Sequence, residues 1–316
     1  ARALDANGAL HAAQGRYAEA IPLYEEALGL RRRALGEVHR FTADSLSNLG
    51  AAQFDGGDPA SAEAPLREAL AIYAQVLPPD SPVPAKTLNN LGLVRHARGD
   101  ASEARSLIER ALVLNRHAYG SEHARVAGNL NNLAIVAESG GDLATAEAAL
   151  REALAIMQRS QGGAHTSLGF PLTNLGRIVL WRGQTAESVA LLERATSIRR
   201  TGLPAQHPAL AETLLWSSLA HCEAGQVPAG LRLLDESTAI RRARATAGDA
   251  ALHDLRALRT ICAAADAQRL TQVEFADWVG RRGASDPLVR RYLQVIAQRT
   301  APSALPSRRL ASTAGN

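Results

Sequence analysis

Residues 88–111 read LNNLGLVRHARGDASEARSLIERA, and the order of small and large residues in this stretch returns every 42 positions along the chain. Glycines mark the period most clearly, standing at Gly15, Gly57, Gly99, Gly141, Gly183 and Gly225. A strict period of this length is typical of an array in which one small structural unit is copied and stacked.

The apolar and small residues of each unit predict two helices. Within a unit they fall at i, i+3, i+4 and i+7, which is the spacing of one face of a helix and not strand alternation. We expect the first helix to run roughly from a repeated leucine to just before the repeated glycine, and the second to follow for four to five turns. The repeated leucines are Leu4, Leu46, Leu88, Leu130, Leu172 and Leu214.

The residues around the repeated glycine predict how the two helices are joined. Glycine adopts left-handed backbone angles without a steric penalty and can therefore end the first helix. The next residue is Asp58, Asp100, Asp142 or Gln184 in four of the units. An aspartate at this position can accept hydrogen bonds from the free amides at the start of the second helix.

This pattern resembles the tetratricopeptide repeat, in which Leu-Gly is followed by Ala and then by a large residue. The usual unit has about 34 residues, and the longer units here resemble the kinesin-light-chain type: Leu88-Asn89-Asn90-Leu91-Gly92 opens a first helix, and Tyr119-Gly120-Ser121-Glu122-His123 follows a second. The resemblance implies an all-α fold, a right-handed α-solenoid of six repeats over residues 1–243. We expect a degenerate repeat with capping helices over 244–300 and a disordered tail over 301–316.

The resemblance also implies that the first helix of each unit lines a concave groove. Asn48, Asn90, Asn132 and Asn174 share one position there, and Asn89 and Asn131 share its neighbour. An amide carries donors and an acceptor, so a row of amides can hold the backbone of an extended peptide. Alternatively, the amides bond to the next helix and fix the geometry of the repeats, and both roles can hold for one side chain. The predicted peptide-binding residues are Lys86, Asn89, Asn90, Leu93, Asn131, Asn132, Ile135, Asn174, Arg177, Trp181 and Trp216.

Within that set, a pocket near Trp181, Arg177 and Trp216 is the predicted anchor for a side chain, because tryptophan is enriched in binding hot spots. The alternative is that both tryptophans belong to the core. The inward basic residues Lys86 and Arg177 lie in different units and face Asp44 and Glu138, so they form an incomplete clamp for a carboxylate. The ligand preferences of known members of the family are therefore not carried over to this chain.

No group of residues predicts catalysis, a cofactor or a metal site. Four histidines share one position of the repeat, but equivalent positions in successive units are too far apart to converge on one ion. We expect these histidines to be loop residues ahead of each first helix. They are His39, His123, His165 and His207.

The predicted function is a non-catalytic scaffold for protein–protein interaction that binds an extended peptide or partner segment in the groove. The alternative is the regulatory or sensory arm of a larger bacterial signalling enzyme, such as a Ser/Thr kinase or a caspase-like peptidase, whose catalytic domain lies outside this chain. Residues 241–316 hold 13 arginines and 6 acidic residues, but no nucleic-acid motif accompanies them, so nucleic acid is not an expected partner. Self-association through the C-terminal helices is a further possibility.

Cysteine usage and hydropathy bear on location. Cys222 and Cys262 do not form a spaced framework, and we expect buried free thiols. The chain has no apolar run of about 18 residues that would cross a membrane. Together these features favour a cytoplasmic protein, and the near absence of lysine is typical of a GC-rich, bacterial source. The first residue is Ala1, so a removed signal peptide or an upstream domain remains an open alternative.

Overall fold

The computed structural model describes residues 1–163 and 165–243, and these residues form α-helices with no strand among them. They divide into two compact units, Ala1–Leu203 and a second beginning at Pro204. The helices of the first unit are α1 (Arg2–Ala13), α2 (Tyr17–Leu35), α3 (Arg40–Asp55), α4 (Pro59–Val76), α5 (Pro84–Ala97), α6 (Ala101–Tyr119), α7 (Ala124–Ser139), α8 (Leu143–Gln161), α9 (Gly169–Trp181) and α10 (Thr185–Gly202). Those of the second are α11 (Pro208–Glu223) and α12 (Val227–Arg242).

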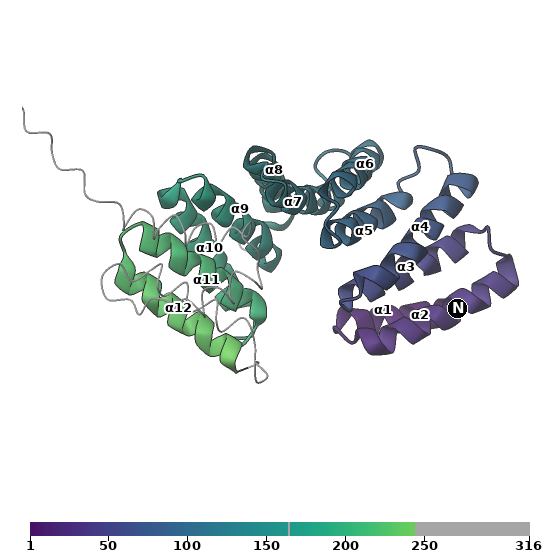
Figure 1. Ribbon diagram of the computed structural model, residues 1–316, viewed down its shortest axis with the longest axis horizontal. Coiled ribbons are helices and arrows are strands. Elements are labelled where there is room, and N and C mark those ends of the chain that lie inside the picture. The colour runs from purple at the N-terminus through teal and green to yellow at the C-terminus, as the bar shows by residue number, and fades with distance from the viewer. Residues whose placement is uncertain (164, 244–316) are drawn as a thin grey trace, which may run out of the picture. The chain divides into compact units, whose positions relative to one another are not determined.

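Odd- and even-numbered helices pair as hairpins, so the two helices predicted for each 42-residue unit are confirmed (Figure 1). In the first unit each hairpin also packs on the next one, as α2 does on α3 and α4 on α5. The predicted segments 244–300 and 301–316, with their capping helices and possible self-association, lie outside the described residues.

The first helix of a hairpin begins earlier than the leucine pattern predicts. Helix α3 begins at Arg40 and α7 at Ala124, each six residues before its repeated leucine. The histidine that precedes the helix explains the difference, because its ring nitrogen acts as an N-cap. His39 Nδ1 accepts a hydrogen bond from the amide of Phe41 at 3.1 Å, and His123 Nδ1 accepts one from Arg125 at 3.1 Å.

The predicted boundary between the helices of a hairpin is confirmed at the glycine–aspartate pairs. Gly57 has φ 91°, and its amide bonds to the carbonyl of Phe54 at 2.9 Å. The Asp58 amide closes the turn onto Gln53 at 2.9 Å, while its carboxylate accepts a hydrogen bond from the Ser61 amide at 3.0 Å. Asp100 and Asp142 cap α6 and α8 in the same way, whereas Gln184 makes no such bond to α10.

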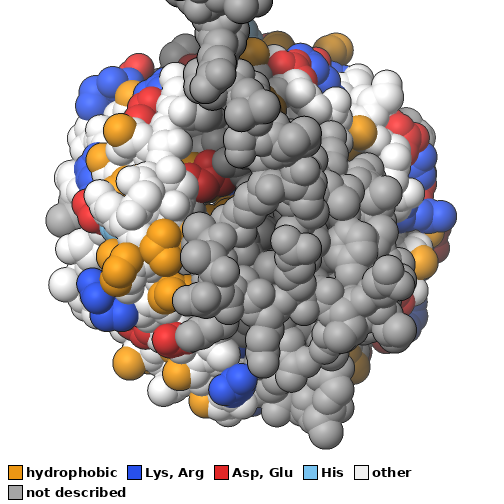
Figure 2. Space-filling model, turned by 60° about the vertical axis from the view of Figure 1, so that its left-hand side comes forward, with side chains coloured by type: hydrophobic (Ala, Val, Ile, Leu, Met, Phe, Trp, Pro, Cys, Tyr) orange, Lys and Arg blue, Asp and Glu red, His pale blue; other side chains and the backbone are white. Residues whose placement is uncertain are grey.

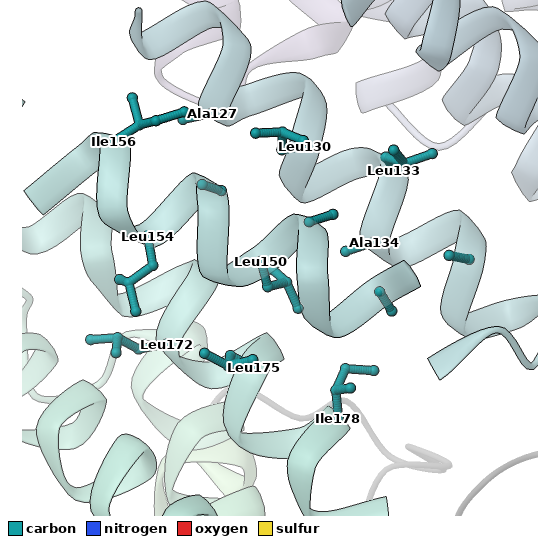
Figure 3. Packing of buried hydrophobic residues seen from close by; sticks show 14 of the residues in the cluster. Ala127, Leu130, Leu133, Ala134, Leu150, Leu154, Ile156, Leu172, Leu175 and Ile178 are labelled. Atoms are coloured by element: carbon teal, nitrogen blue, oxygen red, sulfur yellow. The ribbon is translucent and has the colours of Figure 1, made fainter. Parts of the chain in front are cut away.

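Small residues allow the two helices of a hairpin to approach closely, as helix packing requires. A Cβ atom built on Gly92 would lie 2.7 Å from Ile108 Cγ1 and 3.1 Å from the carbonyl oxygen of Ala104. Between hairpins the core is formed by larger residues. Figure 3 shows Leu150 and Leu154 of α8 lying between the side chains of α7, such as Leu130, and those of α9. Each fully buried leucine of this kind contributes about 1.5–3 kcal/mol.

The aspartate caps should make the fold sensitive to acid. Hydrogen bonds from the side chain and then the backbone of Thr145 hold the pKa of Asp142 below its ordinary value, and similar bonds lower the pKa of Asp58 and Asp100. A lowered folded-state pKa means that this stabilisation is complete above about pH 3.9, the ordinary value, and is lost as the pH falls through the folded value.

Replacement of Asp142 by asparagine tests this acid dependence. An asparagine keeps a capping oxygen that does not titrate. The urea midpoint of Asp142→Asn should therefore fall less than that of the parent between about pH 6 and about pH 3. Equal losses in the two proteins would contradict a role for this cap.

One expectation about the cysteines is wrong. Cys222 forms a disulfide and is not the free thiol that we expected from the sequence. The sequence could not indicate this bond, because two isolated cysteines give no spacing signal. Cys262 lies outside the described residues. None of the helices in residues 1–163 and 165–243 combines the length and the hydropathy of a membrane-spanning segment. The cytoplasmic location stays a prediction and loses the support of the thiols.

Candidate functional site

One face of the first unit carries a row of half-buried asparagines. Residues four apart on a helix share a face. The residue four positions before each asparagine of the row, such as Lys86 before Asn90, therefore lies on this face as well. We call this surface the amide face and define it by Asn48 of α3, Asn90 of α5, Asn132 of α7 and Asn174 of α9.

Two amides of this face, Asn132 and Asn174, bond to asparagines at the adjacent repeat position on the preceding odd-numbered helix. Asn89 Oδ1 accepts hydrogen bonds from Nδ2 of Asn132 at 3.0 Å and from Nδ2 of Asn129 at 3.0 Å, which joins α5 to α7. Asn174 Nδ2 donates to Asn131 Oδ1 at 3.2 Å, which joins α7 to α9. The alternative role predicted for these amides, fixing the geometry between repeats, is therefore present in the structure.

Asn90 differs from the other amides of the row. Within the described part of the chain its side chain makes no hydrogen bond, although it is half-buried on α5. Lys86, one turn earlier and exposed, donates from Nζ to Asn48 Oδ1 on α3 at 3.2 Å. Asn90 thus keeps both donors and its acceptor available, while Asn48, Asn132 and Asn174 are each partly engaged.

The basic residues predicted for the site do not come together. Arg177 of α9 forms an ion pair with Glu138 of α7, and both side chains are mostly buried. Lys86 bonds to Asn48, whereas Asp44, the acid expected opposite it, accepts a hydrogen bond from the Tyr73 hydroxyl at 2.6 Å. These contacts agree with an incomplete clamp for a carboxylate.

Next to the Arg177–Glu138 pair lies a histidine that the sequence did not single out. His96 Nδ1 is 3.3 Å from Ser139 Oγ, which links the ends of α5 and α7. Burial lowers the pKa of His96, and the charge of Glu138 acts in the opposite direction. The lowered pKa favours the neutral ring at neutral pH, so this end of the face gains no charge from His96.

The predicted apolar residues differ in burial. Leu93, Ile135 and Trp181 are half-buried on α5, α7 and α9. Trp216 lies on α11 of the second unit, where 8% of it is exposed. The predicted anchor of Trp181, Arg177 and Trp216 combines residues of both units and stays a prediction.

The four histidines that share one repeat position are N-caps, as their place ahead of the first helices suggests. His165 and His207 accept hydrogen bonds from the amides of Ser167 and Ala209 at 3.2 and 3.1 Å, as His39 and His123 do in their units. In residues 1–163 and 165–243 no group of three or more possible ligands could hold a metal ion.

The sequence-based set missed a buried amide pair beneath the face. Asn115 Nδ2 donates to Asn129 Oδ1 at 2.6 Å, and the two residues are 4% and 5% exposed. Asn129 stands at the position occupied by Ser45 and Thr87 in the preceding units. That recurrence of polar residues was the available signal for a polar contact between helices.

Charged side chains elsewhere are interspersed. Even-numbered helices are joined by ion pairs such as Arg67–Glu103 at 2.9 Å and Arg116–Glu152 at 2.7 Å. On the face drawn in Figure 2, positive and negative side chains of the described residues are mixed and do not gather by sign. Exposed pairs of this kind contribute little to stability individually.

The hairpins and their contacts define a helical-repeat protein of the class that binds other proteins. The family model for the tetratricopeptide repeat matches residues 1–75, 84–159 and 126–201. The chain belongs to the tetratricopeptide repeat family, whose members bind protein partners and are generally non-catalytic.

Several solved structures share this fold. BtubC (BKLC) from P. vanneervenii is 24% identical, with a TM-score of 0.60 over 71% of this chain and 90% of that one. A putative kinesin light chain with nearly identical repeats from Podosopora anserina is 25% identical, with a TM-score of 0.55 over 65% and 97%. The apo form of RapI is 14% identical, with a TM-score of 0.62 over 81% and 98%. No curated protein matches the chain. The kinesin-light-chain-like resemblance is thereby confirmed.

Proposed function

We propose that this protein is a non-catalytic scaffold that binds an extended segment of a partner protein along the amide face of its first unit. The observation that carries the proposal is the row of half-buried amides on consecutive odd-numbered helices. An extended chain presents a carbonyl or an amide group at every residue, and an asparagine side chain can pair with either. Recognition through such groups requires no charge complementarity.

The bonds that this row makes to the adjacent asparagines leave capacity for a ligand. Asn132 Nδ2 and Asn174 Nδ2 each donate one hydrogen bond to a neighbouring amide, at 3.0 and 3.2 Å. An NH₂ group has two donors, so one hydrogen of each stays available. The internal bonds also hold the side chains in place, which lowers the entropy lost when a ligand binds.

Simultaneous replacement of Asn90, Asn132 and Asn174 by alanine tests the proposal. Partners captured by the full chain, identified by mass spectrometry, should no longer bind the triple variant. The far-ultraviolet circular dichroism should stay that of a helical protein, because each substitution places a strong helix former in a helix.

The matched control uses Ser102, Ser106 and Thr145, polar residues of the even-numbered helices α6 and α8. Alanine at these three positions should leave binding unchanged. A partner that binds the asparagine variant with the affinity of the parent would contradict the proposed use of the amide face.

A further inference from the structure

The contact between Lys86 and Asn48 shows which positions of successive units meet on the amide face. Lys86 lies one turn before the asparagine of its own helix and reaches back to the asparagine of the preceding odd-numbered helix, at 3.2 Å. Gly128 and Phe170 occupy the same repeat position on α7 and α9. By the repeat, position 128 lies beside Asn90 and position 170 beside Asn132.

Gly128 therefore leaves Asn90 uncovered. No heavy atom lies within 4 Å of a Cβ built on Gly128, the residue is exposed, and its backbone is not in the left-handed region. A glycine inside a helix costs about 1 kcal/mol relative to alanine, and here neither close packing nor backbone conformation requires it. The glycine at position 128 leaves open space in front of the Asn90 amide, which makes no hydrogen bond within the described residues.

Phe170 supplies an ordered apolar surface on the same face. The phenylalanine is 56% exposed, and the guanidinium carbon of Arg199, a residue only 1% exposed, lies 4.6 Å from the ring centroid. Gly169 makes this possible, because a Cβ at that position would meet Arg199 Nε at 2.7 Å. An exposed ring held by a buried cation is already fixed before a ligand arrives, which favours its use as an anchor.

We infer that Asn90, Gly128 and Phe170 form one subsite for an extended peptide that carries a bulky apolar side chain. The Asn90 amide pairs with a peptide group of the ligand, the ligand backbone passes over Gly128, and the apolar side chain packs on Phe170. Helices α5 and α9 are separated by α7, so at about 8–10 Å per helix the ends of the subsite are up to about 20 Å apart. An extended chain covers that distance in about six residues.

This inference rests on the proposed function, and a peptide selection distinguishes the two. A phage-displayed library of random 12-residue peptides is selected on the full chain, and the dissociation constant of an enriched synthetic peptide is measured by fluorescence anisotropy. Gly128→Lys places at position 128 the residue type that stands at the equivalent position of the preceding unit, where Lys86 covers Asn48. Gly128→Lys and Phe170→Ser should each weaken binding by about tenfold or more. The melting temperature of Gly128→Lys should equal or exceed that of the parent, because lysine is the better helix former.

Two controls make the result specific. Gly29→Lys changes another helical glycine, on α2, where an added Cβ would meet only the end of the Arg33 side chain at 3.5 Å, and it should leave binding unchanged. Replacing the apolar residue of the peptide by serine should weaken binding to the parent but have little further effect on Phe170→Ser, since the two groups contact each other.

The outcomes separate cleanly. One outcome would overturn this subsite and leave the proposed function intact. In it, the peptides no longer bind the variant with alanine at Asn90, Asn132 and Asn174, but they bind Gly128→Lys and Phe170→Ser as tightly as the parent. A selection that enriches no peptide dependent on the asparagine row would count against both.

Discussion

Replacing Gly92 by valine should destabilise the protein by about 3 kcal/mol. The first added atom would already lie 2.7 Å from Ile108 Cγ1 and 3.1 Å from the carbonyl oxygen of Ala104. A backbone oxygen cannot move aside without displacing α6, so the hairpin of α5 and α6 has to open. In a stacked array the loss spreads to the neighbouring hairpins, because each is stabilised by contact with the next.

Gly128→Val is the matched control for this change, since both substitutions exchange the same residue types inside a helix. Nothing lies within 4 Å of the added Cβ at Gly128, so its effect should be within about 0.5 kcal/mol of the parent. Urea unfolding followed by circular dichroism measures both variants. Similar midpoints for the two would mean that close packing at Gly92 does not hold the hairpin together.

Removing the buried amide of Asn129 should lower the free energy of unfolding by about 2–3 kcal/mol. Asn129→Ala deletes the hydrogen bond from Asn115 at 2.6 Å and the one to Asn89 at 3.0 Å. Asn115 is only 4% exposed, so its NH₂ group would be left in the interior without a partner. Such a group carries the full penalty of lost hydration, about 1–3 kcal/mol.

A double-mutant cycle isolates that penalty. Asn115→Ala combined with Asn129→Ala removes both partners, so the double variant should be more stable than the sum of the single effects predicts, by about 1 kcal/mol or more. Urea midpoints at one pH provide all four values. Simple additivity would mean that the pair does not join α6 to α7 energetically.

The helix hairpins could be predicted because their determinants are local. Gly57 and Asp58 act on the backbone within a few residues of themselves, and the leucine spacing of one helix does not depend on its neighbours. The start of the first helix was missed although its determinant is equally local. The N-cap is a histidine ring nitrogen, and histidine is not among the residues that ordinarily signal a helix start.

The site could be predicted only as a row of positions. The repeat places Asn90, Asn132 and Asn174 at one position, but it does not say which amide bonds to which neighbour. That depends on side-chain orientation across helices, which separates Asn90 from the rest. Lys86 and Gly128 occupy the same position of successive units. Lys86 covers the amide of Asn48, whereas Gly128 leaves the amide of Asn90 open.

Nuclear magnetic resonance of side-chain amides reports directly on whether a peptide binds along the amide face. The protein is labelled with ¹⁵N only in asparagine, and the NH₂ resonances are followed while a selected peptide is added. The Asn90 resonance should shift most, with smaller changes at Asn132 and Asn174. A peptide that binds while the Asn90, Asn132 and Asn174 resonances stay in place would contradict binding along the amide face.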